Sequence, residues 1–204
     1  MAVFDKIIET IKKFNDSRKI KKWERAGSPI PTPHLVKQLA IKKYKHIYGY
    51  NILVETGTFR GDMVEAQRNH FDYVYSIELS PKLWQDAVNR FRKSDNISIM
   101  QGDSGNVLKE IISTLDQPAI FWLDGHYSAG ETAKGEKECP IFEELDCIFI
   151  KNKFNHVLLI DDARCFNGEG DYPTIENLTA YIKSKNNKYQ LEVKDDILRY
   201  TVLS

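Results

Sequence analysis

The pattern of hydrophobic and polar residues changes near Gly49. Before it, apolar residues recur at helical spacing over positions 4–14 and again over 34–48. An apolar residue every three or four positions is typical of a helix with one buried face. Between the two stretches, GSPIPTPH at 27–34 contains three prolines, which interrupt a helix. We therefore expect a helical extension over residues 1–48, with a proline-containing connector inside it.

After Gly49, short apolar runs alternate with polar stretches of helix length. The runs are NILVET, YVYSIEL, ISIMQGD, AIFWLDG and HVLLIDD. Strands alternating with helices favour right-handed crossovers and a mostly parallel sheet with helices on both faces. The closing segment YQLEVKDDILRYTVLS has two alternating runs around a pair of aspartates, which predicts an antiparallel hairpin. Residues 49–204 are thus expected to form one α/β domain with a Rossmann-like, doubly wound sheet.

Each of the five apolar runs ends in an acidic residue. These residues are Glu55, Glu78, Asp103, Asp124 and the pair Asp161 and Asp162. The carboxyl ends of parallel strands meet at one edge of a sheet, where ligands bind in such folds. A single aspartate after a strand is explained by helix capping. Acidic ends on all five runs indicate a shared binding rim.

The turn after the first run, VETGTFRG at 54–61, stands where a dinucleotide-binding fold has GxGxxG. Phe59 occupies the place of the second glycine, and the carboxylate of Glu55 would repel phosphate. The phosphate-loop sequence GK[ST] does not occur either. The turn therefore favours a cationic or amino-bearing ligand over a pyrophosphate.

The next two acidic ends suit the parts of a nucleoside. Glu78, which ends the second run, is placed to accept the two hydroxyls of a ribose. Asp103 and Ser104, in QGDSG, could accept a hydrogen bond from an adenine amino group. A ligand with an adenosine, no phosphate and a cationic amino acid end matches all three sites. S-adenosylmethionine fits this description.

The order E-x-G-x-x-x-G, an acidic second strand end, GDS, DG and IDD resembles the class I S-adenosylmethionine-dependent methyltransferases over roughly residues 51–166. ETGTFRGDM, YSIELS, FWLDGHYSAGETAKGE and HVLLIDDAR are most similar to small bacterial members, nearer to metal-dependent small-molecule O-methyltransferases than to nucleic-acid ones. The resemblance implies a seven-stranded sheet of order 3-2-1-4-5-7-6. Phe59 departs from a glycine of the family pattern. Carried over by position, the cofactor-binding residues are Glu55, Thr56, Gly57, Thr58, Gly61, Glu78, Leu79, Asp103, Ser104 and Asp124.

The ends of the fourth and fifth runs should lie next to each other in this fold. The carboxylates of Asp124, Asp161 and Asp162 would then offer hard oxygen ligands suited to Mg²⁺. The resemblance implies that such a metal orients the acceptor hydroxyl and lowers its pKa. The open alternative is that Asp161 or Asp162 caps the following loop.

The segment DGHYSAGET follows the fourth run. Together with Asp124, His126 is the candidate catalytic residue, because an imidazole can take a hydroxyl proton at neutral pH. Its alternative role is a hydrogen bond to a neighbouring carboxylate. Tyr127 is expected to contact the substrate, and Arg164 to meet an anionic group of the acceptor.

Composition limits the partners. Lys and Arg equal Asp and Glu at 29 each, so no overall charge selects nucleic acid or an anionic membrane. The three cysteines form no CxxC pair, and no signal peptide or apolar span of membrane length occurs. We expect a cytoplasmic protein with a small-molecule acceptor, and a homodimer could form through the amphipathic first helix.

Two other functions are alternatives to the methyltransferase. A metal-dependent hydrolase or phosphotransferase could use Asp124, Asp161 and Asp162, although the missing phosphate loop speaks against it. A non-catalytic cofactor-binding module would keep the fold without the reaction, which the intact series of acidic strand ends disfavours.

Overall fold

The computed structural model describes residues 15–125, 139–151 and 153–203. The strands are β1 (Ile52–Thr56), β2 (Tyr73–Glu78), β3 (Ile97–Gln101), β4 (Ile120–Leu123), β5 (Val157–Ile160), β6 (Tyr189–Lys194) and β7 (Ile197–Val202). The helices are α2 (His34–Tyr48), α3 (Asp62–Gln67), α4 (Pro81–Phe91), α5 (Ser104–Thr114), α6 (Ile141–Phe149), the 3-10 turn η1 (Ala163–Cys165) and α7 (Ile175–Lys185).

The seven strands form one sheet in the order β3-β2-β1-β4-β5-β7-β6, which confirms the predicted fold class. Strands β1 to β5 pair in parallel, and β7 pairs antiparallel with both β5 and β6. The β6–β7 hairpin turns at Asp195 and Asp196, whose φ angles are +54° and +56°. Two central residues of positive φ suit the twist of a two-residue hairpin, and Asp tolerates this conformation.

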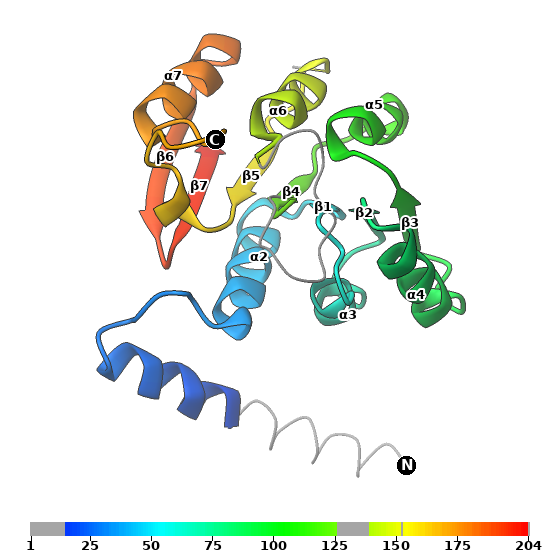
Figure 1. Cartoon of the computed structure of the whole chain (residues 1–204), viewed down its shortest axis with the longest axis horizontal. Helices are drawn as coiled ribbons and strands as arrows, with labels where there is room; N and C mark the ends of the chain where they lie inside the picture. The colour runs from blue at the N-terminus through cyan, green and yellow to red at the C-terminus, as the bar shows by residue number, and fades with distance from the viewer. Residues whose placement is uncertain (1–14, 126–138, 152, 204) are drawn as a thin grey trace.

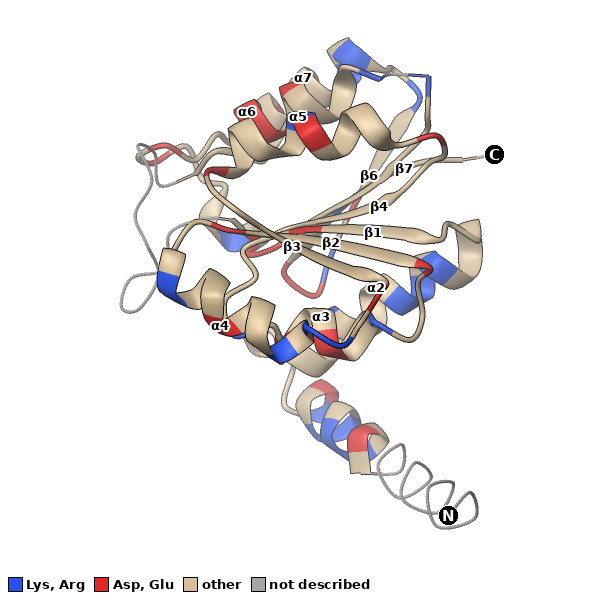
Figure 2. Cartoon of the chain, turned by 90° about the vertical axis from the view of Figure 1, so that its right-hand side faces the viewer, with Lys and Arg blue, Asp and Glu red and all other residues tan. Residues whose placement is uncertain are grey.

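Helices cover both faces of the sheet (Figure 2), with α2, α3 and α4 on one side and α5, α6 and α7 on the other. This explains the continuous apolar runs, since a strand covered on both faces has no polar side. Every residue of β1, β4 and β5 is buried, whereas the edge strand β3 is partly exposed.

Helix α2 begins and ends as the sequence predicted, at His34 and Tyr48, and Gly49 follows it with φ +68°. It packs directly on the sheet, because Ala40, Ile41 and Tyr44 are buried in one cluster with residues of β1, β4 and β5. The helical residues 15–25 instead lie apart from the sheet (Figure 1). The predicted boundary at residue 48 therefore stays a prediction, with α2 part of the packed layers.

Across the described ranges, the helices are too short or too polar to span a bilayer.

Candidate functional site

Three of the acidic strand ends lie on neighbouring strands. Glu55 of β1 is in register with Ser76 of β2, and Glu78 of β2 is in register with Gln101 of β3. Asp103 follows β3 by two residues and stands at the N-cap position of α5. Glu55, Glu78 and Asp103, with the turn at 56–61, form what we call the β1–β3 rim.

The turn after β1 requires a glycine at position 57. Gly57 has φ +85°, and its N–H donates to the carbonyl of Ile77 over 2.9 Å. A Cβ at this position would overlap the backbone carbonyl of Asp124. The turn therefore lies directly against the end of β4, and a side chain at Gly57 would push the two apart.

Phe59 takes the left-handed conformation that a glycine would supply, with φ +49°. Its N–H donates to Oε2 of Glu78 over 2.7 Å, and its side chain is 42% exposed. The ring therefore points away from the packed turn, and the departure from the family pattern keeps the backbone course. Gly61 has φ +76°, and a Cβ there would lie 2.7 Å from the ring of Phe91.

Glu55 is a buried carboxyl group beneath this turn, with 2% of its surface exposed. The hydroxyl of Ser76 donates to its Oε2, and the hydroxyls of Ser76 and Thr58 are 2.6 Å apart. Burial raises the pKa of Glu55 to about 8; the Ser76 hydrogen bond opposes the rise and the nearby Glu78 carboxylate adds to it. Near neutral pH, Glu55 is therefore largely protonated.

Both carboxylate oxygens of Glu78 accept hydrogen bonds from backbone N–H groups. Oε2 accepts from Phe59 N, and Oε1 accepts from Ser80 N over 2.8 Å. A carboxylate has about four lone-pair sites, so each oxygen can accept one more hydrogen bond. Glu78 thus fixes the two loops on either side of it and keeps capacity for hydroxyl donors.

The side chains of Asp103 and Ser104 differ in their hydrogen bonding. Asp103 is half-buried, and its side chain makes no capping bond to α5. The hydroxyl of Ser104 donates to Oε1 of Glu144 over 2.6 Å. Glu144, on α6, is a buried acid that the sequence pattern did not indicate, and a Cβ at Gly125 would lie 2.9 Å from its Oε1. Its position in the first turn of a helix gave no signal beyond the usual preference for acidic residues there.

The end of β4 is tied to β1. The N–H of Asp124 lies 3.2 Å from both the carbonyl and the hydroxyl of Thr56, which is fully buried. Because Thr56 also pairs with Leu123, Asp124 has a defined place beside the β1 turn. His126 and Tyr127 lie outside the described residues, so their proposed roles as base and substrate contact stay predictions.

The acids after β5 are occupied by a lysine from α2. Lys37 Nζ forms ion pairs with Oδ2 of Asp161 and, over 3.4 Å, with Oδ1 of Asp162. Burial disfavours the ammonium, but Asp161 and Asp162, together with Asp124, outweigh this and raise the pKa of Lys37. Asp161 is fully buried, and its Oδ1 has no hydrogen-bond partner among the described residues. Asp124, Asp161 and Asp162 form what we call the β4–β5 rim.

Arg164 also pairs with this rim. Its Nη1 donates to Oδ1 of Asp162 over 2.8 Å and to Oδ2 of Asp196 in the hairpin turn. Two other groups donate hydrogen bonds to this turn: the N–H of Ala163 to the carbonyl of Asp196, and the hydroxyl of Thr32 to the carbonyl of Asp195. The contact of Arg164 with an anionic acceptor stays a prediction, and its guanidinium is already engaged by two carboxylates.

The β4–β5 rim does not fit the Mg²⁺ site that the sequence suggested. Within the described ranges, no group of three His, Cys, Asp or Glu side chains is placed to hold a metal ion. The Oδ1 atom of Asp162 already accepts from both Lys37 and Arg164. An ammonium between the carboxylates supplies the positive charge that a metal would bring.

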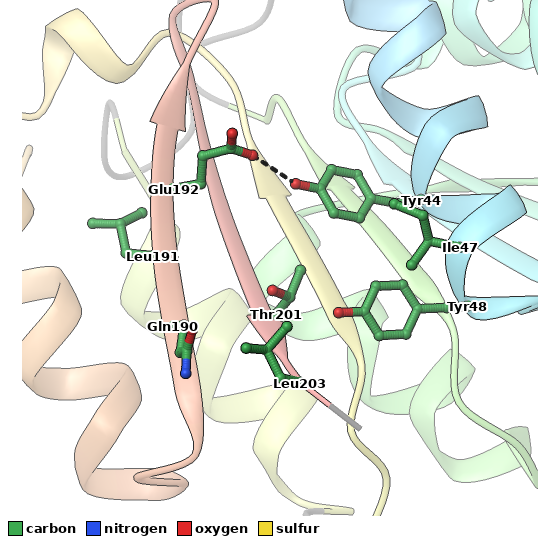
Figure 3. A pocket seen from close by; sticks show the side chains of 8 residues that line it. All are labelled: Tyr44, Ile47, Tyr48, Gln190, Leu191, Glu192, Thr201 and Leu203. Atoms are coloured by element: carbon green, nitrogen blue, oxygen red, sulfur yellow. Dashed lines mark hydrogen bonds between the residues drawn. The ribbon is translucent and has the colours of Figure 1, made fainter.

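A separate hollow of about 280 Å³ lies between α2 and the β6–β7 hairpin (Figure 3). Its lining includes Tyr44, Ile47, Tyr48 and Glu192, and Tyr44 donates to Oε2 of Glu192 over 3.0 Å. None of the predicted site residues that the structure describes lines it, so it is not part of either rim.

No family model matches the sequence, and no curated protein is similar to it at a significant level. The structure is similar to many solved ones. The strand order 3-2-1-4-5-7-6 is the feature that identifies the fold. The chain has the fold of the class I S-adenosylmethionine-dependent methyltransferases.

Three solved structures illustrate this likeness. The O-methyltransferase TomG from Streptomyces achromogenes, involved in tomaymycin synthesis and solved with S-adenosylmethionine, has a TM-score of 0.60 and 11% identity, covering 93% of this chain and 89% of TomG. An O-methyltransferase from Bacillus cereus in complex with S-adenosylhomocysteine has a TM-score of 0.59 and 12% identity, covering 91% and 90%. The 23S rRNA methyltransferase ErmE has a TM-score of 0.53 and 12% identity, covering 85% and 70%. At such identities the likeness concerns the fold.

Proposed function

We propose that this chain is an S-adenosylmethionine-dependent methyltransferase that methylates a hydroxyl group of a small molecule. The observation that carries the proposal is the β1–β3 rim, where Glu55, Glu78 and Asp103 lie at or just beyond the carboxyl ends of three neighbouring strands, beside the Gly57 turn. Solved structures of the same fold contain S-adenosylmethionine or S-adenosylhomocysteine, which supports this choice of cofactor.

The residues of the rim have distinct tasks in this proposal. The cofactor, when bound, supplies a methyl group on a sulfonium, which needs little more than in-line positioning to react. Glu78 accepts the two ribose hydroxyls on lone pairs that its backbone contacts leave open. Asp103 accepts from the adenine amino group. The amino acid end lies over the Gly57 turn, where the carboxyl group of Glu55 becomes the counter-charge of the α-ammonium.

The acceptor is proposed as a small molecule with a hydroxyl group. Two of the three structures described above carry the name O-methyltransferase, whereas ErmE is named a 23S rRNA methyltransferase, so the fold alone does not select the acceptor. The equal numbers of acidic and basic residues support an acceptor other than nucleic acid. A hydrolase or phosphotransferase built on the β4–β5 rim is less well supported, because Lys37 and Arg164 already engage its carboxylates.

Isothermal titration calorimetry with S-adenosylhomocysteine tests the proposal. We expect binding by the wild-type chain and a loss of roughly 10- to 100-fold in Glu78→Gln, about 1.4–2.8 kcal/mol, since the amide offers fewer acceptor sites. Asp86→Asn, which changes an exposed acid on α4, is the matched control and should bind as the wild type does. No detectable heat with millimolar ligand would remove the proposal. Binding without methyl transfer to any hydroxyl compound would favour the non-catalytic module.

A further inference from the structure

The β4–β5 rim gathers several carboxylates at a site that is closed by protein cations. Asp161 is fully buried, and the side chain of Asp162 is 14% exposed. Buried carboxylates are costly unless a positive charge compensates them. In this chain the compensation comes from Lys37, whose side chain is 13% exposed and which belongs to an element far away in the sequence.

We propose that the ammonium of Lys37 takes the place of a divalent cation at the β4–β5 rim, so that the native protein holds no metal there. Lys37 reaches both consecutive aspartates, and Asp162 shares its Oδ1 with Arg164 over 2.8 Å. A Mg²⁺ ion that bridges Asp161 and Asp162 would have to lie about 2.1 Å from an oxygen of each, in the space that the ammonium takes. The two arrangements are mutually exclusive, because a lysine and a divalent cation cannot occupy one position between the same carboxylates.

One oxygen of Asp161 is not engaged by Lys37 and could bind a metal ion. Oδ1 of Asp161 is buried and has no hydrogen-bond partner within the described ranges, although an unpaired buried acceptor is unfavourable. With Lys37 replaced by a neutral side chain, Asp161 would lose its ion-pair partner. A divalent cation bound by these two aspartates would complete its coordination with water, because within the described ranges no third acidic side chain is placed to join them. The lysine therefore takes the place of such a cation.

The consequence for methyl transfer rests on the proposed function. An ammonium has three N–H donors, and two of those of Lys37 are directed at Asp161 and Asp162. The third can donate to an acceptor oxygen, which a metal would otherwise orient. Lys37 would thus be a positioning residue, and the transfer would not depend on added Mg²⁺.

Titration of the whole chain with Mn²⁺ tests the inference without a methyl acceptor. Binding is measured by electron paramagnetic resonance, as the loss of the signal of the free ion. We expect no binding below about 1 mM by the wild type or by Lys37→Arg, which keeps the charge. Lys37→Gln should bind at least about tenfold more tightly, and Lys37→Gln combined with Asp161→Asn should lose that site. Lys183→Gln, at an exposed position on α7, is the matched control.

Each result decides the question. Tight Mn²⁺ binding by the wild type that Asp161→Asn abolishes would overturn the inference, and this arm stands even if Lys37→Gln does not fold. A folded Lys37→Gln that binds no Mn²⁺ would also overturn it, because the site would not suit a cation. S-adenosylhomocysteine titrated into the same proteins keeps the two proposals apart. Its failure to bind would remove the methyltransferase and leave the result for Lys37 intact.

Discussion

The two rims are assembled from residues at very different separations in the chain. At the β1–β3 rim, Glu55 receives a hydrogen bond from Ser76, and Glu78 receives one from Phe59, so the partners are about 20 residues apart. At the β4–β5 rim, Lys37 meets Asp161 from 124 positions away. One rim is made by successive strand–helix units, and the other is closed by a helix that precedes the whole sheet.

This difference separates the two rims electrostatically as well. The β1–β3 rim keeps a buried carboxyl group that is neutral at rest, because the pKa of Glu55 is about 8. At the β4–β5 rim, Asp161 and Asp162 are instead paired with Lys37 and Arg164. A cationic ligand therefore meets a carboxyl group that no described cation pairs with at the first rim, whereas at the second it must displace a cation that the protein already provides.

The largest expected effect is at Gly57, where the two rims touch. Gly57→Ala should lower the affinity for S-adenosylhomocysteine by at least about 100-fold and lower the melting temperature, because the new Cβ overlaps the carbonyl of Asp124. Calorimetry and thermal unfolding measure the two changes. Gly27→Ala is the control: Gly27 has a similar φ of +83°, but no described residue lies within 4 Å of its Cβ position. An affinity within about threefold of the wild type would show that the rims do not depend on this contact.

A smaller effect is expected from the proton on Glu55. Its folded pKa of about 8 means that the free protein holds this proton at pH 7, and an ammonium bound beside it should lower that pKa. Binding of S-adenosylhomocysteine should then release up to about one proton, and the affinity should rise by up to about tenfold per pH unit between pH 6 and 8. Calorimetry in buffers of different ionisation enthalpy measures the release.

Glu55→Gln should bind S-adenosylhomocysteine more weakly and lose this pH dependence.

The stability of the free protein should change with pH in the opposite direction to the affinity. A raised folded pKa stabilises the protein at acidic pH, and this contribution is lost as the pH rises from the unfolded value of 4.5 through about 8. Equal affinities at pH 6 and 8 in the wild type would mean that Glu55 does not face the ligand's charge.

The smallest effect on the cofactor is expected at the other rim. Arg164→Met should destabilise the protein by about 1–2 kcal/mol, because Asp196, with 3% of its side chain exposed, loses its ion-pair partner and keeps only the hydrogen bond from the backbone N–H of residue 164. The affinity for S-adenosylhomocysteine should stay within about twofold, since the carboxylates that Arg164 engages, Asp162 and Asp196, lie outside the β1–β3 rim. Chemical denaturation and calorimetry measure the two quantities.

Lys185→Met is the matched control for this comparison. Its ion pair with Asp146 is exposed on both sides, so its removal should cost about 0.5 kcal/mol or less. If Arg164→Met weakened cofactor binding as much as it weakened the fold, the two rims would not be independent.

The sequence predicted the sheet and the β1–β3 rim from signals that lie close together in the chain. The apolar runs marked the strands, and the acid that ends each run marked the rim. Helix α2 was predicted with its observed bounds, because its apolar spacing ended at Gly49. Glycine at positions 57 and 61 indicated a tight turn, and the structure adds the reason, which is contact with Asp124 and Phe91.

The occupant of the β4–β5 rim could not be predicted in this way. A lysine on a helix is usually solvated, and nothing in the spacing of Lys37 indicates that it reaches Asp161. The hydrogen bond of Ser104 to Glu144 depends likewise on how α5 and α6 pack against each other on one face of the sheet. Contacts between distant elements follow from the three-dimensional packing, which periodicity in a single sequence does not encode.

The hairpin turn at Asp195 and Asp196 bears on the order in which the molecule can assemble. It holds Arg164 and Ala163 beside β5, and Thr32 ahead of α2. A nascent chain can form β1, β2 and β3 while later residues are still being synthesised. The contacts of this turn with Arg164, Ala163 and Thr32 cannot form until residues 195 and 196 have left the ribosome. The segment before α2 and the segment after β5 are therefore fixed to each other only after the hairpin has been synthesised.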